Sequence, residues 1–185
     1  MKLETDRFTL ESMSRLEATW RTYAWTFDPE VMHPFGFPSG TWTWRSWYKH
    51  FRKFNNRHKF CLAIRPKGAR RVIGFESFEA GHSGLAILTV IIGDRNWWGK
   101  NVVQETRPAV IDFIFKHVGC GKVWGMPAAR NFPSVANYLA LGFQCEGVLR
   151  KHAFDPVTKE MEDRLAFGLL KREWLERQQT LGARA

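Results

Sequence analysis

The amino-acid sequence predicts an α/β fold in which a mixed central sheet of about seven strands is flanked by helices. Short β-rich runs alternate with helical runs, which is the pattern of an α/β layout. One β-rich run leads through a helix into another such run, which predicts at least one parallel crossover. The 185 residues contain no repeat and no low-complexity linker, so a single domain over 1–185 is expected.

The first part of the chain combines one strand with two helices. Residues 7–13 begin with the apolar–polar alternation of a half-buried strand. Residues 15–25 and 42–55 carry apolar side chains at steps of three and four, which predicts helices. Between the two helices, the prolines and glycines of DPEVMHPFGFPSG are typical of irregular structure.

Three strands and a long helix follow. Residues 59–65, 71–78 and 85–92 are β-rich and are separated by good turn sequences. Residues 100–117 are helical by period, and Pro108 is expected to kink this helix because it removes one backbone hydrogen bond. Five apolar side chains form the predicted buried stripe of this helix: Val102, Val103, Val110, Phe113 and Ile114.

The last part of the chain returns to the sheet. Residues 122–126 predict a strand, and 134–141 a short helix that Gly142 ends as its C-cap. Two further strands at 144–154 and 163–170 and a terminal helix at 171–179 complete the fold.

The composition restricts the class of protein. A formal charge of +10 favours anionic partners such as phosphates, nucleic acid or an acidic protein surface, although a solvated surface is the alternative. No run approaches the ~20 apolar residues of a membrane helix, and the N-terminus lacks the apolar core of a signal peptide, so we expect a cytoplasmic location. Three cysteines without CxxC spacing predict reduced thiols and no metal site.

The most informative stretch is TVIIGDRNWWGKNVVQE, residues 89–105. A β-rich run ends in a short polar turn, and an amphipathic helix starts at once. The N-terminus of a helix presents unpaired N–H groups and a partial positive charge, which bind phosphate. Arg95 and Lys100 flank the turn and could add charge-assisted contacts. The alternative is an ordinary connection between a strand and a helix.

Three segments carry a resemblance to a known family. NWWGKN at 96–101 resembles the pyrophosphate loop of the GNAT superfamily, Q/R-x-x-G-x-G/A, with asparagine at both Asn96 and Asn101. NFPSVANYLALGFQCEGVLRK at 131–151 resembles the signature of the Rim-like branch, the ribosomal-protein alanine/serine N-acetyltransferases. EDRLAFGLLKREW at 162–174 is similar to the last strand of that group and its terminal tryptophan.

The resemblance implies the GNAT fold and the transfer of an acetyl group from acetyl-CoA to a primary amine. The amine would belong to a protein N-terminus or to a small molecule. The resemblance further implies that the backbone of three strand residues polarises the thioester carbonyl and pairs with the pantetheine arm. These residues are Val90, Ile91 and Ile92. Stabilisation of the developing oxyanion in this way is commonly worth about 3–4 kcal/mol.

The remaining implied cofactor contacts lie in the loop and in the short helix: Arg95, Gly99, Lys100, Asn101, Val102, Val103, Asn131, Ser134 and Tyr138. Tyr138 matches the general acid of many GNAT enzymes, and Ser134 matches the Rim-type serine credited with a similar role. Three of these residues have a structural alternative. Tyr138 could be an aromatic packing residue, Ser134 could bond to backbone N–H groups at the start of a helix, and Asn131 could cap that helix.

The general base and the acceptor stay open at this level. Six side chains lie near strand ends without a clear catalytic position: Glu76, Glu79, His82, Asp94, Glu146 and His152. Ordered water is the alternative base.

A catalytically impaired acyl-CoA-binding protein is a second functional class. A nucleic-acid-binding module is a third, because KHFRKFNNR at 49–57 interleaves basic and aromatic residues. The aromatic region 23–48 falls where this family builds the wall of its acceptor site. A homodimer is a possible oligomeric state.

Overall fold

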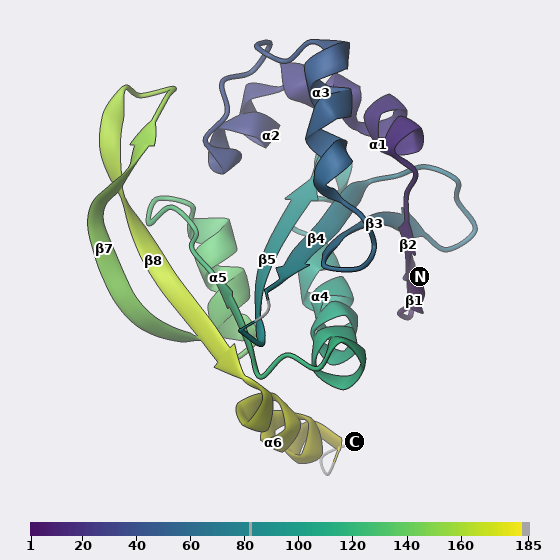
Figure 1. Ribbon diagram of the computed structural model, residues 1–185, viewed down its shortest axis with the longest axis vertical. Helices are drawn as coiled ribbons and strands as arrows, with labels where there is room; N and C mark the ends of the chain where they lie inside the picture. The colour runs from purple at the N-terminus through teal and green to yellow at the C-terminus, as the bar shows by residue number, and fades with distance from the viewer. Residues whose placement is uncertain (82, 183–185) are drawn as a thin grey trace.

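The computed structural model describes residues 1–81 and 83–182 and contains an eight-stranded sheet in the order β1-β2-β3-β4-β5-β6-β8-β7 (Figure 1). The strands are β1 (Lys2–Glu4), β2 (Phe8–Ser12), β3 (Lys59–Pro66), β4 (Gly74–Ala80), β5 (Leu85–Ile92), β6 (Lys122–Gly125), β7 (Gln144–Asp155) and β8 (Glu160–Leu170). β5 and β6 are parallel, and the other ladders are antiparallel. The predicted α/β class, mixed sheet and parallel crossover are therefore confirmed.

Six α-helices accompany the sheet in the described part of the chain: α1 (Arg15–Thr22), α2 (Pro29–Met32), α3 (Trp44–His50), α4 (Val102–Phe113), α5 (Phe132–Ala140) and α6 (Lys171–Gly182). Polar side chains cap several of them. Ser14 accepts from a backbone N–H of α1, and Thr43 and Ser46 form a reciprocal capping box at α3. The C-cap of α5 is Leu141, one residue before the predicted Gly142, and Gly142 follows it with a φ of +89°.

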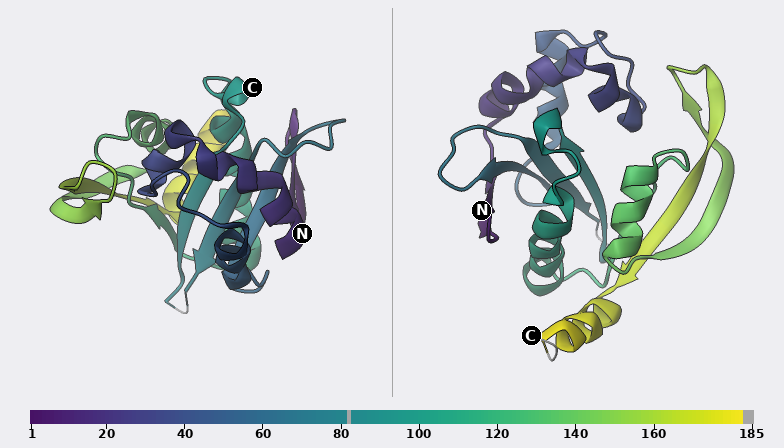
Figure 2. Two further views of the ribbon diagram at one scale, coloured as in Figure 1. Left: turned by 90° about the horizontal axis from the view of Figure 1, so that it is seen from above. Right: turned by 180° about the vertical axis from the view of Figure 1, so that it is seen from behind.

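The helices form two layers, one on each face of the sheet (Figures 1 and 2). Alternate residues of β3 point to opposite faces, so Leu62 joins the core under α4 and α5, and Ala63 joins the core under α1 and α3. The first core contains most of the predicted stripe of α4, and Phe113 packs against it half-buried. The second core is rich in aromatic side chains such as Trp47 and Phe51.

Several predicted boundaries were wrong. The helices expected at 15–25 and 42–55 are shorter, because α1 and α3 each pass into a 3-10 turn, Tyr23–Phe27 and Phe51–Lys53. The segment expected to be irregular contains α2, which Asp28 caps and Pro29 starts. The sheet has one more strand than expected, since the short and polar β1 has no alternation that periodicity could detect.

The long helix also differs from its prediction at both ends. Its first helical residue is Val102 rather than Lys100, because Asn101 takes a left-handed conformation. After Phe113 it continues as a π-helical turn, Ile114–Val118, that ends at Gly119 with a φ of +82°. Pro108 lies within α4, where it donates no backbone hydrogen bond.

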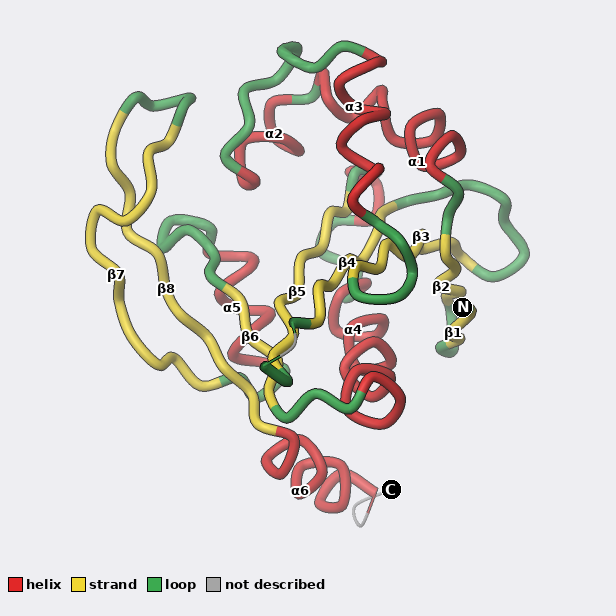
Figure 3. The backbone as a smooth tube through the Cα atoms, in the orientation of Figure 1, coloured by secondary structure: helices red, strands yellow, loops and turns green. Residues whose placement is uncertain are grey.

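β7 and β8 form a long curved hairpin whose tip reaches toward the α2 region (Figure 3). The carboxylate of Asp155 at the end of β7 accepts a hydrogen bond from the Nε2 atom of His33 at 2.9 Å, so hairpin and helical layer meet here. No helix in the described residues is long and apolar enough to cross a membrane.

Candidate active site

A gap between two parallel strands defines the centre of the candidate site. β5 and β6 pair over Leu85–Ile87 and Lys122–Trp124, and their ladder ends there. β5 continues to Ile92 beside β4. The chain after β6 instead stays beside β8, to which a bridge between Ala128 and Arg164 joins it. The backbone of β5 from Leu88 onward therefore faces a widening gap, and backbone N–H and C=O groups in such a gap require other partners. Val90, Ile91 and Ile92 lie in this part of β5.

The loop after β5 has the geometry of an anion site. Gly99 and Asn101 both have positive φ values, of 71° and 56°, and α4 starts directly after them. Alternating left- and right-handed residues turn successive N–H groups to one side, and the first turn of a helix leaves its N–H groups unpaired. The loop and the N-terminus of α4 thus fit a phosphate group through the N–H groups of Gly99, Asn101, Val102 and Val103. The N–H of Lys100 donates to the carbonyl oxygen of Trp97 at 3.4 Å, so Lys100 would contribute its side chain.

The two cationic side chains that flank this loop, Arg95 and Lys100, make different contacts. Arg95 does not turn toward α4, because its guanidinium pairs with Asp28 at 3.7 Å and with Glu30 at 2.7 Å. The Lys100 ammonium lies 5.4 Å from the centre of the Trp97 ring and remains exposed at the surface. Lys100 can therefore reach an anion at the loop, whereas Arg95 connects the loop to α2.

Tyr138 projects from α5 into the gap. Its side chain is buried, its ring stacks on Phe167 at 5.1 Å, and its hydroxyl lies 3.5 Å from the carbonyl oxygen of Leu88. That distance is long for a hydrogen bond between oxygens, so the hydroxyl can donate to another group. Burial raises the pKa of the Tyr138 hydroxyl, and the phenol stays protonated at neutral pH. A Cβ atom on Gly125 would overlap this hydroxyl, so the last residue of β6 must be glycine.

A buried ion pair lies beside Tyr138. Arg107 of α4 and Glu76 of β4 are 1% and 0% exposed, and the guanidinium donates to the carboxylate at 3.2 Å from both Nε and Nη2. The hydroxyl of Thr106 donates to the same carboxylate at 3.3 Å. The Arg107 guanidinium carbon lies 5.5 Å from the centre of the Tyr138 ring. Arg107 therefore joins the tyrosine to a fixed charge network inside the core.

The start of α5 places the two remaining predicted residues. Asn131 is the N-cap, and its side chain accepts from the backbone N–H of Ser134 at 3.2 Å. Ser134 and Tyr138 are four residues apart, so they lie on the same side of α5. The amide of Gln104 in α4 donates to the Asn137 side chain at 2.7 Å and holds the two helices together. The capping alternative for Asn131 is thus present in the structure, and it leaves the Ser134 hydroxyl without a capping role.

The candidate bases are mostly engaged in other contacts. Glu76 is buried against Arg107, Glu79 pairs with Lys59, Asp94 with Arg71, and Glu146 with Lys122. His152 is exposed on an irregular stretch of β7, and His82 lies outside the described residues. This leaves ordered water as the simplest acceptor for the proton of the amine.

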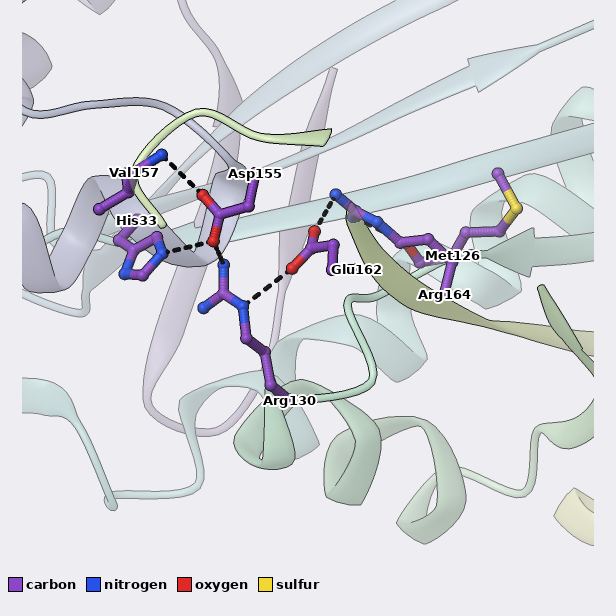
Figure 4. Close-up of polar contacts among 7 residues, drawn as sticks. All are labelled: His33, Met126, Arg130, Asp155, Val157, Glu162 and Arg164. Atoms are coloured by element: carbon purple, nitrogen blue, oxygen red, sulfur yellow. Dashed lines mark hydrogen bonds and ion pairs between the residues drawn. The ribbon is translucent and has the colours of Figure 1, made fainter. Parts of the chain in front are cut away.

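A polar network fixes the tip of the β7–β8 hairpin (Figure 4). The carboxylate of Asp155 is buried and accepts from His33, from Arg130 at 2.6 Å and from the N–H of Val157 at 2.8 Å. Burial favours a higher pKa for Asp155, but these donors outweigh it and hold the pKa well below its usual range. The network therefore joins the segment before α5 to the hairpin tip and the helical layer.

The same network continues along β8. Glu162 accepts from Arg130 at 2.8 Å and from Arg164 at 2.6 Å, and Arg164 also donates to the carbonyl oxygen of Met126 at 3.4 Å. Met126 directly follows β6, so Arg164 holds the chain on the far side of the gap. These contacts attach the residues that follow β6 to β8 rather than to β5.

Sequence reasoning missed Arg107, Gly125 and Arg164. One signal was available for Arg107, because it lies four residues after Val103 on the apolar stripe of α4, and a charge there requires a buried partner. A glycine inside a predicted strand often marks a close approach, which was the available signal for Gly125. Arg164 had no signal, since its partners are set by the curvature of the hairpin.

Comparison with known proteins identifies the family. A family model described as an acetyltransferase (GNAT) domain matches residues 7–144. The chain therefore belongs to the GNAT acetyltransferase family, and it is an acyl-CoA-dependent N-acetyltransferase whose acyl donor is acetyl-CoA. An uncharacterized N-acetyltransferase, p20, from Bacillus licheniformis is 28% identical over 179 residues, which cover 93% of this chain and 97% of that protein.

Solved structures share the fold. The ribosomal-protein-S5-alanine acetyltransferase from Vibrio fischeri is 17% identical with a TM-score of 0.76, covering 94% of this chain and 98% of that one. A spermidine N-acetyltransferase from Vibrio cholerae, solved with CoA and spermine, is 17% identical with a TM-score of 0.79, covering 91% and 98%. At these identities the likeness shows the fold alone.

Proposed function

We propose that this N-acetyltransferase belongs to the Rim-like branch and acetylates the N-terminal amine of a polypeptide. The resemblance of residues 131–151 to the Rim-type signature supports this branch. The surplus of positive charge argues against small cationic amines, because a basic surface repels them. The observation that carries the chemistry is the Tyr138 hydroxyl beside Gly125, at the point where β5 and β6 separate.

Acetyl-CoA supplies the acetyl group as a thioester. In the proposed arrangement, backbone N–H groups of Gly99 and of residues 101–103 hold its pyrophosphate, and the backbone of Val90–Ile92 binds the pantetheine arm. One of these strand N–H groups donates to the carbonyl oxygen as negative charge develops there. The arm then runs along the gap toward Tyr138.

The proton balance assigns a role to Tyr138. The neutral amine attacks the carbonyl carbon, the new C–N bond forms, and the C–S bond breaks. Tyr138 gives its proton to the departing sulfur, for which its raised pKa keeps it in the protonated form. The surplus proton of the amine passes to ordered water, and solvent reprotonates Tyr138. Ser134, on the same side of α5, is the rival donor.

A small amine is the second candidate acceptor, because the Vibrio cholerae neighbour is named a spermidine N-acetyltransferase. A thiol-release assay with acetyl-CoA separates the two candidates. The panel contains short peptides with free N-termini, the same peptides with blocked N-termini, a polyamine and an amino sugar. We expect release only with the free peptides. Faster release with the polyamine would overturn the proposed acceptor, and no release with any amine would overturn the proposed chemistry.

A further inference from the structure

The net charge of the chain is concentrated in one segment. Residues 31–75 contain ten Lys and Arg residues and no Asp or Glu, a surplus that equals the net charge of +10 of the whole chain. This segment supplies α3, β3 and much of the core on the side of α1 and α3. Some of its cations are neutralised, such as Arg65 by Glu11 and Glu17. Others extend from the surface, so this segment makes its face of the molecule rich in positive charge.

A basic and aromatic hollow lies within this face. It has a volume of about 370 Å³ and is lined by Trp20, Arg21, Trp25, Arg70, Arg71 and Val72. Trp20 is 72% exposed and touches only the edge of the Trp44 ring among the described aromatic side chains, at 5.9 Å between centres. Arg21 and Arg70 are exposed and form no ion pair with any described residue.

The hollow is close to the outer end of β5. The ring of Trp25 lies directly over Gly93, where no Cβ would fit, and stacks on Phe75 at 6.4 Å. Arg71 pairs with Asp94 at 2.9 Å. Ile91, two residues before Gly93, faces the same core as α1 and α3, on the face of the sheet opposite α4. The hollow therefore opens on the side of β5 that faces away from the helix of the pyrophosphate loop.

We propose that this hollow, the Trp20–Arg70 site, docks an acidic stretch of the acceptor polypeptide. The inference rests on the proposed function and specifies its substrate as a polypeptide with carboxylates beyond the reactive amine. Arginine forks pair with carboxylates in bidentate geometry, and an exposed tryptophan beside arginine is typical of the residues that dominate protein interfaces. Positive charge over the whole face steers an acidic partner toward the end of β5.

A protein partner fits this surface better than a nucleic acid. Single-stranded nucleic acids stack successive bases on several aromatic side chains. The hollow offers one exposed indole, that of Trp20. In KHFRKFNNR, Phe51 is buried and Phe54 packs against the same core, so these rings provide no platform. The aromatic rings of residues 49–57 thus belong to the interior, whereas the basic side chains of this segment are exposed.

Binding without an amine tests the site separately from the acetyl transfer. The probe is an N-acetylated, fluorescein-labelled peptide with a run of glutamates, compared with its glutamine counterpart by anisotropy at low salt. We expect the acidic peptide to bind about tenfold more tightly, with affinity that falls as salt rises. Arg21→Glu/Arg70→Glu should remove this preference, and Trp20→Ala should weaken binding several-fold.

Matched controls decide the outcome. Arg57→Glu/Arg172→Glu makes the same change in charge at exposed positions outside the hollow and should shift affinity by less than about threefold. Titration with acetyl-CoA should give the same affinity for all variants, since none lies in the pyrophosphate loop. Three outcomes would each overturn the proposal. The two peptides could bind equally, the two double variants could lose affinity equally, or a single-stranded RNA could bind more tightly than the acidic peptide in a way that Trp20→Ala abolishes. Binding of the N-acetylated acidic probe, together with no thiol release from acidic peptides with free N-termini, would leave the docking site standing and contradict the proposed function instead.

Discussion

Asn101 occupies a loop position that the GNAT motif reserves for glycine or alanine. Its φ of 56° lies in the left-handed region, where asparagine is tolerated better than other residues with a side chain. Its side chain makes no capping contact at α4. The sequence difference is therefore compatible with the loop conformation.

Asn101→Gly should bind acetyl-CoA as tightly as the wild type or more tightly, because glycine adopts this conformation freely and removes bulk near the phosphates. Asn101→Val should bind it less tightly, by up to about 5- to 30-fold, since a β-branched residue is strained at positive φ by about 1–2 kcal/mol. Calorimetric titration with acetyl-CoA measures both. A clear loss in the glycine variant would show that the Asn101 amide contacts the cofactor.

The Glu76–Arg107 pair stabilises the core only while both charges are present. Arg107→Met should lower the free energy of unfolding by about 3–5 kcal/mol, because it leaves the Glu76 carboxylate buried without its partner. Denaturant unfolding at neutral pH measures this loss. The double variant Arg107→Met/Glu76→Leu should recover most of it, and an equally unstable double variant would contradict the account.

At the scale of elements, α3 contains a histidine that the aromatic core keeps neutral. The His50 ring stacks on Trp47 at 5.0 Å, and burial, with the charge of Lys53, lowers the pKa of His50 to about 4. In the unfolded chain a histidine takes up a proton below about pH 6.5. Between these two pH values the unfolded state binds more protons, so the free energy of unfolding falls as pH falls.

His50→Phe keeps the stack on Trp47 and removes the titration. Between pH 7 and pH 4.5, the wild type should lose roughly 1–2 kcal/mol more stability than this variant, allowing for the part of the ring that remains exposed. Urea unfolding at several pH values measures the difference. Parallel pH profiles for the two proteins would show that His50 is not responsible.

The elements also show what periodicity can predict. The stripe of α4 was predicted because its apolar spacing is regular, and β3 and β5 were predicted because each is a β-rich run bounded by turn sequences. β1 and α2 were missed because each is too short for a period, and the ends of α1 and α3 shift because 3-10 turns continue the helical spacing. The fold was therefore predictable where local pattern and tertiary packing agree.

At the scale of the molecule, the site depends on contacts between distant segments. The loop at 96–101 and the position of Tyr138 followed from a resemblance in sequence. The Tyr138–Gly125 contact, the Arg107 pair and the Asp155 network join residues far apart in the chain. A local pattern can mark one member, such as Arg107 or Gly125, but it does not identify the partner. The turn of Arg95 toward α2 was unexpected for the same reason. The single-domain organisation and the homodimer stay predictions.

The central claim is that Tyr138 protonates the departing thiolate in the gap between β5 and β6. Tyr138→Phe keeps the stack on Phe167 and removes only the hydroxyl, so turnover on a verified amine substrate should fall by roughly 10²-fold. Acetyl-CoA affinity should stay near the wild-type value, because the pyrophosphate site proposed at the loop does not include the Tyr138 hydroxyl. Ser134→Ala measured alongside should retain most of its turnover. Near-wild-type thiol release by Tyr138→Phe would contradict the claim and leave Ser134 or water as the donor.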